Sequence, residues 1–133
     1  MRFWDNSAVV PLIFREPTSE SLDELLAEDG GMAVWWGTWV ECAVTISRLK
    51  RDGKLGEEFE RETRSALGRL AVDWMEVEPM DDVRLLASIL SKDHPLKAAA
   101  SFQLAAGRNF ICLDRTLRRA ATNEGFDVFP EAA

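Results

Sequence analysis

Strand-like and helix-like segments alternate along the whole chain, and this alternation limits the possible folds more than any other feature of the sequence. Strand patterns fall at residues 2–4, 32–37, 74–77, 110–113 and 127–129. Further helical patterns cover residues 38–51, 57–72, 81–90 and 114 to about 123. Such alternation indicates a parallel sheet with helices on both faces. We therefore predict an α/β fold, a three-layer α/β/α sandwich with a central parallel sheet.

Ordinary start and stop signals mark two other predicted helices. One starts at the signal Pro17-Thr18-Ser19 and stops at Gly30-Gly31, since glycine is the usual residue just beyond a helix. The other begins at His94 and Pro95 and runs to about residue 106, with proline at its first position. The apolar residues 8–14 follow the first strand closely, and a short helix is expected to begin near Ala8.

Length and composition indicate one ordinary globular domain spanning residues 1–133. With 47% hydrophobic and 29% charged residues, the chain can build a core without disulfides or structural metals. Cys42 and Cys112 lie in apolar segments and are predicted to be buried free thiols, as in a reducing compartment. No apolar run approaches the roughly 20 residues of a membrane span, and no signal-peptide pattern is present. We expect a cytoplasmic protein with no membrane partner.

The formal net charge of −7 argues against a general nucleic-acid binder, because such proteins are usually basic. It does not exclude a nuclease. A site built from carboxylates adds negative charge, and bound divalent cations reverse the local field.

Three carboxylates follow three of the predicted strands. Asp5 comes after the first strand, Glu41 lies one turn into the helix after the second, and Asp114 follows residues 110–113. In parallel α/β folds, ligands bind outside the carboxyl ends of the strands. Clustered carboxylates repel one another unless a cation offsets them, and hard oxygen ligands select Mg²⁺ or Mn²⁺. The three positions together predict a metal site.

Each of these carboxylates also has a structural interpretation. Asp114 suits the N-cap of the helix that follows it, and Asp5 could cap the short helix near Ala8. Thr38 and Glu41 have the spacing of a capping box. Taken one at a time, capping is the better interpretation, whereas the shared position at strand ends favours a joint role.

Four short segments carry acidic or polar residues beside apolar runs: residues 3–10 (FWDNSAVV), 39–44 (WVECAV), 94–105 (HPLKAAASFQLA) and 110–117 (FICLDRTL). These segments resemble the sequence motifs of PIN domains, in the order and spacing of the VapC-like toxins. Each segment alone is a weak signal, but the four in this order and spacing are fairly specific, and the resemblance extends over nearly the whole chain. Two positions depart from the family pattern. Ala100 stands where the third motif carries a metal-binding aspartate, and Cys112 replaces the usual threonine of the fourth. Position 100 is either a deliberate inactivation of a toxic nuclease or a natural loss.

The resemblance implies a metal-dependent endoribonuclease that cuts single-stranded or looped RNA. It implies that Asp5 and Asp114 bind Mg²⁺ or Mn²⁺ directly, and that Glu41 binds a second metal or orients water. Asn6 and Ser7 would support the site by hydrogen bonding. It also implies a cognate antitoxin and a homodimer. Two alternatives stay open: a catalytically dead PIN-like interaction module that binds an antitoxin or RNA, and an RNA-processing nuclease without an antitoxin.

Other features of the sequence favour structural roles. His94, the single histidine, is expected to cap a helix or lie in solvent. Of the three tryptophans at positions 35, 36 and 39, we expect two in the core and one facing a partner. The thiols lack basic neighbours that would activate them. The arginines at 115, 118 and 119 are typical of a solvated helix face, although beside a metal site they could steer RNA phosphates.

Overall fold

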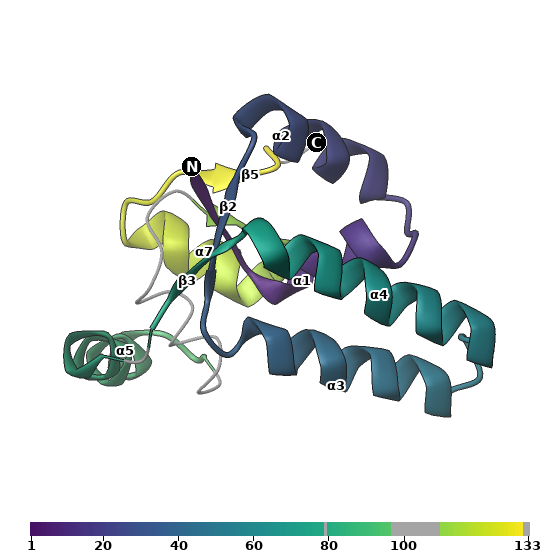
Figure 1. Ribbon diagram of the computed structural model, residues 1–133. Coiled ribbons are helices and arrows are strands. Elements are labelled where there is room, and N and C mark those ends of the chain that lie inside the picture. The colour runs from purple at the N-terminus through teal and green to yellow at the C-terminus, as the bar shows by residue number, and fades with distance from the viewer. Residues whose placement is uncertain (79, 97–109, 132–133) are drawn as a thin grey trace.

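The parallel sheet is present, with helices on both faces, as the computed structural model of the chain shows (Figure 1). The structure describes residues 1–78, 80–96 and 110–131. Its sheet has the strand order β3-β2-β1-β4-β5, and every pair of neighbouring strands is parallel. The strands are β1 (Arg2–Trp4), β2 (Met32–Trp35), β3 (Met75–Val77), β4 (Phe110–Ile111) and β5 (Val128–Phe129). The predicted fold class is therefore confirmed.

Two apolar clusters lie on opposite faces of the sheet and define the layers. Side chains in a strand alternate between faces, so Trp4 joins one cluster and Phe3 the other. Among the helices of the described residues, the Trp4 cluster packs against four and the Phe3 cluster against two. The first four helices are α1 (Asn6–Ile13), α2 (Ser19–Asp29), α3 (Thr38–Arg51) and α4 (Glu57–Asp73). The other two are α5 (Asp81–Asp93) and α7 (Arg115–Asn123).

The predicted helix ends agree better with the structure than the predicted strand ends. Helix α3 has the predicted bounds, and α2 ends at Gly30, whose φ of 72° is the left-handed conformation that glycine adopts readily. Helix α1 begins at Asn6, directly after β1 and before the expected Ala8. Strand β2 stops at Trp35, two residues before its predicted end, because the chain turns there into α3.

The predicted helix start at His94 and Pro95 is wrong for the part that the structure describes. Helix α5 continues to Asp93, and His94 is its C-cap with an extended backbone. Pro95 is not helical. The rest of that predicted helix, including Ala100, lies outside the described residues.

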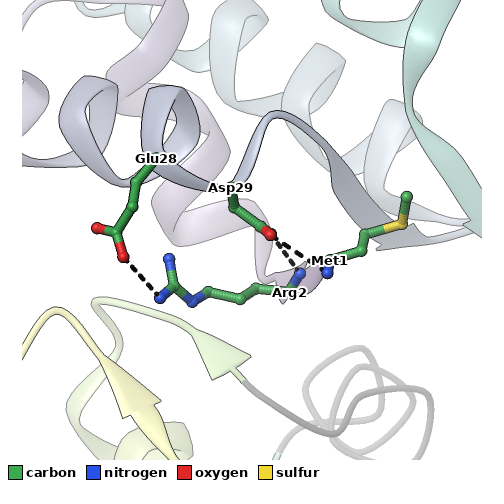
Figure 2. Close-up of polar contacts among 4 residues, drawn as sticks. All are labelled: Met1, Arg2, Glu28 and Asp29. Atoms are coloured by element: carbon green, nitrogen blue, oxygen red, sulfur yellow. Dashed lines mark hydrogen bonds and ion pairs between the residues drawn. The ribbon is translucent and has the colours of Figure 1, made fainter.

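A polar network fastens the beginning of β1 to the end of α2 (Figure 2). The backbone N–H of Arg2 donates to Asp29 Oδ2 at 2.8 Å, and the amino group of Met1 lies 3.2 Å from Asp29 Oδ1. The Arg2 guanidinium lies 3.4 Å from Glu28 Oε1. The hydrogen bond from Arg2 is the main reason that the pKa of Asp29 is lowered. The network fixes the strand that leads into Asp5.

Both cysteines are buried free thiols, as predicted. Burial raises the pKa of the Cys42 thiol to about 12 and raises that of Cys112 as well, so neither is an activated nucleophile. The tryptophan prediction is wrong in number: Trp35 is buried, whereas both Trp36 and Trp39 are exposed. Across the described ranges, no helix combines the length and the apolar character that crossing a membrane requires.

Candidate active site

Three neighbouring strands of the sheet carry the three predicted carboxylates beyond their carboxyl ends. Strand β1 lies between β2 and β4 and leads directly into Asp5. Glu41 lies in the first turn of α3, which follows β2, and Asp114 lies between β4 and α7. Adjacent strands are only about 4.8 Å apart. The parallel sheet thus brings three chain segments that are distant in sequence to one edge.

Asp5 is buried and is the N-cap of α1. Its Oδ2 accepts a hydrogen bond from the backbone N–H of Ser7 at 3.1 Å and another from the Ser7 hydroxyl. Its Oδ1 is buried with no hydrogen-bond partner among the described residues. Burial raises the pKa of Asp5 against the lowering effect of these hydrogen bonds, and the charge of Asp114 raises it further. One carboxylate oxygen is thus engaged in the fold and the other is left for a ligand.

Ser7 joins the turn after β1 to the segment after β4. Its hydroxyl donates to Asp5 and accepts from the backbone N–H of Leu113 at 2.9 Å. The Cys112 thiol lies 3.6 Å from Asp5 Oδ2. The Ser7 hydroxyl thus fixes Asp5 against the loop that leads to Asp114, while its supporting role at a metal site stays a prediction. Asn6 is the first residue of α1.

Glu41 is half-buried and lies close enough to Asp5 for the two charges to interact. Burial raises the pKa of Glu41 to about 7, and the charge of Asp5 contributes to this rise. Asp5 also raises the pKa of the neighbouring Cys42 thiol. The carboxylate of Asp5 therefore lies near the first turns of α3, and Glu41 can change its protonation near neutral pH.

Asp114 is exposed and combines capping with an electrostatic effect on Asp5. Its Oδ1 accepts a hydrogen bond from the backbone N–H of Leu117 at 2.8 Å, which makes it the N-cap of α7. Its charge raises the pKa of Asp5. The capping interpretations of Asp5 and Asp114 are confirmed. The capping box of Thr38 and Glu41 is not, because the N-cap of α3 is Gly37 and no side chain caps that end.

The oxygen donors at this edge suit a hard divalent cation, but they form an incomplete set. Within the described ranges, no group of three or more histidine, cysteine, aspartate or glutamate side chains is arranged to hold a metal ion. Asp5 nevertheless has an unpaired buried oxygen. The charge of Asp114 raises the pKa of Asp5, and the charge of Asp5 raises the pKa of Glu41. Oxygen ligands of this kind fit Mg²⁺ or Mn²⁺. The role of the three residues as metal ligands stays a prediction.

Two other sequence interpretations change once the contacts are known. The Arg118 guanidinium does not extend into solvent but donates to the backbone carbonyls of Cys112 at 2.7 Å, Phe129 at 3.3 Å and Pro130 at 2.6 Å. It fastens the ends of β4 and β5 and is not available to steer RNA. The His94 Nε2 lies 2.8 Å from Glu124 Oε1, so this histidine pairs with a carboxylate instead of lying in solvent.

Thr38 is the polar residue that sequence reasoning assigned wrongly. Its side chain is completely buried at the start of α3, and its hydroxyl has no hydrogen-bond partner among the described residues. The spacing from Thr38 to Glu41 matched a capping box, so the sequence predicted a local capping role for Thr38. It gave no indication that Thr38 lies, like Glu41, at the start of α3 with its hydroxyl unpaired.

The fold is the α/β/α sandwich with a parallel sheet that the sequence predicted, which is consistent with a PIN-like fold, and solved structures share it. PAE2754 from Pyrobaculum aerophilum superposes with a TM-score of 0.66 at 16% identity, over 95% of this chain and 81% of that one. A chain from a toxin–antitoxin complex of Klebsiella pneumoniae superposes with a TM-score of 0.57 at 16% identity, over 86% of this chain and 87% of that one. No family profile and no curated protein matches the sequence. At this level of identity, the likeness establishes the fold alone.

Proposed function

We propose that the chain is a VapC-like PIN-domain protein, a metal-dependent endoribonuclease toxin whose acidic set is incomplete at position 100. One observation carries the proposal: the buried carboxylate of Asp5 is coupled by charge to both Glu41 and Asp114 at the ends of three adjacent parallel strands. Structural ion-pair networks also perturb pKa values, but here all the coupled groups are acidic. Carboxylates placed together are stabilised by a bound proton or a bound cation, and a divalent cation at this edge would support a metal-dependent reaction.

The side chains of this edge divide the work of such a reaction. Asp5 Oδ1, Glu41 and Asp114 would hold the cation, while Ser7 keeps the other oxygen of Asp5 in place. Bound Mg²⁺ or Mn²⁺ would lower the pKa of a coordinated water and neutralise the charge that builds on the phosphate. Glu41 would bind a second cation or orient the attacking water.

The partners of this protein are proposed on the same basis. RNA is the substrate that the resemblance implies, and a cognate antitoxin would cover the site. The superposable Klebsiella pneumoniae chain comes from a toxin–antitoxin complex, which supports an antitoxin partner for this chain. We also propose a homodimer. Its interface would be the exposed apolar face of α3, where Val40 and Val44 lie one turn apart beside Trp39.

Ala100 supports a second candidate, a PIN-like interaction module that has lost catalysis. Position 100 lies outside the described residues, so the evidence for it is the motif of residues 94–105. A module of this kind would still bind an antitoxin or RNA but would not cleave RNA when aspartate is restored at position 100.

The two candidates separate in a cleavage assay of Ala100→Asp. We expect the purified variant to cut a mixture of cellular RNA in Mg²⁺ but not in EDTA, and its induction to arrest growth. The double variant Ala100→Asp, Asp5→Asn is the control and should do neither, because it lacks the central carboxylate. An Ala100→Asp protein that folds and leaves RNA intact would favour the interaction module. Cleavage that survives Asp5→Asn would contradict the assignment of the site.

A further inference from the structure

Two buried side-chain oxygen atoms in the described part of the chain have no hydrogen-bond partner, and one of them belongs to the candidate site. They are Asp5 Oδ1 and Thr38 Oγ1. The other buried unpaired atoms of the described residues are nitrogens, Arg2 Nη1 and Trp4 Nε1, which can donate but cannot bind a cation. Burying a hydroxyl without a partner is unfavourable, so such a group calls for an explanation.

Local helix chemistry does not explain the Thr38 hydroxyl. Helix α3 begins at Thr38, but Gly37 is its N-cap and no side chain caps it. The backbone N–H of Glu41 already donates to the carbonyl of Gly37 at 3.1 Å, so it does not need the threonine oxygen. By contrast, the Thr45 hydroxyl in the same helix donates to the carbonyl of Glu41 at 3.0 Å, as threonine commonly does inside a helix.

The position of Thr38 relates it to Asp5. Thr38 follows β2, the strand that pairs with β1, and Asp5 follows β1. The charge of Asp5 acts on Glu41 and Cys42, which lie three and four residues after Thr38 and therefore on its side of the helix. Both unpaired oxygens thus lie where the ends of β1 and β2 meet the first turns of α3.

We propose that Thr38 is a further ligand of this site and that its hydroxyl oxygen binds the same divalent cation as Asp5 Oδ1. The inference rests on the proposed metal-dependent function. Threonine and serine hydroxyls bind Mg²⁺ in phosphate-binding loops, so the chemistry has a precedent. A neutral hydroxyl adds an oxygen ligand without adding charge, which suits a site where carboxylates already repel one another.

Mn²⁺ binding measured by electron paramagnetic resonance tests this role on the intact chain. We expect Thr38→Val, which keeps the shape and removes the hydroxyl, to bind Mn²⁺ about tenfold more weakly than the wild type. Thr38→Ser should restore binding. Thr63→Val is the matched control, because Thr63 is also a buried threonine but lies in α4. It should bind Mn²⁺ as the wild type does.

Thermal unfolding in EDTA supplies a second readout. Thr38→Val should melt no lower than the wild type, since the hydroxyl has no partner to lose in the absence of metal. A marked loss of stability, greater than that of Thr63→Val, would show that the hydroxyl is used in the fold and would overturn the proposal.

The remaining outcomes distinguish this inference from the proposed function. If Thr38→Val binds Mn²⁺ as the wild type does while Asp5→Asn does not bind it, the metal site stands and Thr38 is not a ligand. If the wild type itself binds no Mn²⁺ at millimolar concentration, the proposed metal-dependent function fails, and this inference fails with it.

Discussion

Glu41 and Asp5 show how position in the fold changes the chemistry of single residues. Each carboxyl group has a raised pKa, and in each case burial is the main cause. Burial disfavours the charged form of a carboxyl group, and a nearby like charge disfavours it further. In the absence of a cation, the folded chain therefore holds protons at this edge that the unfolded chain would release.

This linkage predicts that Glu41→Gln stabilises the protein at alkaline pH. The pKa of Glu41 is about 7 in the folded chain and 4.5 without the protein environment. The folded state binds the proton of the Glu41 carboxyl group more tightly than the unfolded state does. Ionisation of Glu41 therefore lowers the free energy of unfolding as pH rises from 4.5 to about 7, and the full destabilisation is present above that range. Below that range Glu41 is neutral and costs nothing.

Urea unfolding in EDTA at pH 4 and at pH 8 measures the effect. At pH 8 we expect the free energy of unfolding of Glu41→Gln to be higher than that of the wild type by about 1 kcal/mol. This value is smaller than the full pKa shift would give, because Glu41 is partly exposed. At pH 4 the two should agree. Glu62→Gln, which alters an exposed glutamate of α4, controls for the general effect of removing a charge. A difference between Glu41→Gln and the wild type that does not change with pH would contradict the raised pKa.

The positions of Asp5 and Asp114 at strand ends could be predicted from the sequence. The buried, unpaired hydroxyl of Thr38 could not. An aspartate between a strand pattern and a helix pattern predicts both an N-cap and a place at the ligand-binding edge, and the structure shows both caps. Whether a buried hydroxyl has a partner depends on the packing of segments that are distant in sequence. No local pattern at Thr38 reports it.

At the scale of elements, strand ends were less predictable than helix ends because tertiary contacts set them. The apolar pattern at 110–113 predicted four strand residues, but β4 ends at Ile111. The carbonyl of Cys112 accepts from Arg118, and the N–H of Leu113 donates to Ser7. These backbone groups serve side chains that the local sequence does not reveal. Helix α3, by contrast, follows its own apolar spacing.

The turn from β2 into α3 sets the position of Glu41 and depends on a close contact. A Cβ atom added at Gly37 would lie 2.3 Å from Nε1 of the buried Trp35 indole, although the backbone conformation there does not require glycine. We predict that Gly37→Ala destabilises the protein by about 1–3 kcal/mol, as overpacking does. Gly68→Ala is the control: no atom lies near its added Cβ.

Urea unfolding shows whether each substitution, Gly37→Ala or Gly68→Ala, raises or lowers the free energy of unfolding. Gly68 lies inside α4, so alanine there should stabilise the protein by about 0.5–1 kcal/mol through helix propensity. The account of the turn fails if Gly37→Ala is as stable as the wild type.

At the scale of the whole molecule, the exposed apolar face of α3 is a candidate for self-association. Its apolar side chains Trp39, Val40 and Val44 are all exposed, and Arg51 lies at its C-terminal end. In a two-fold symmetric pair the same face meets itself, so antiparallel copies of α3 would bury these side chains against one another and keep the two Arg51 side chains at opposite ends of the contact. Apolar character and symmetry therefore favour this arrangement.

We predict that Val44→Glu disrupts the proposed homodimer. Val44 is 56% exposed, so the change should not impair folding of one chain, but it would place a charge in the interface. Val72→Glu is the control, because Val72 is 80% exposed on α4. Light scattering after size exclusion should give a dimer for the wild type and Val72→Glu, and a monomer for Val44→Glu. A monomeric wild type at 100 μM-scale concentration would refute the dimer.

The central claim is that one edge of the sheet holds a divalent cation, and paramagnetic broadening by Mn²⁺ in NMR spectra of the isotope-labelled chain tests it most directly. We predict that substoichiometric Mn²⁺ broadens the amide signals of Asn6, Ser7, Glu41 and Asp114 first, and that Asp5→Asn prevents this. The acidic C-terminal part of α2, around Glu28, should be unaffected, although its carboxylates are as numerous. Broadening centred on α2, or broadening at the sheet edge that persists in Asp5→Asn, would contradict the account.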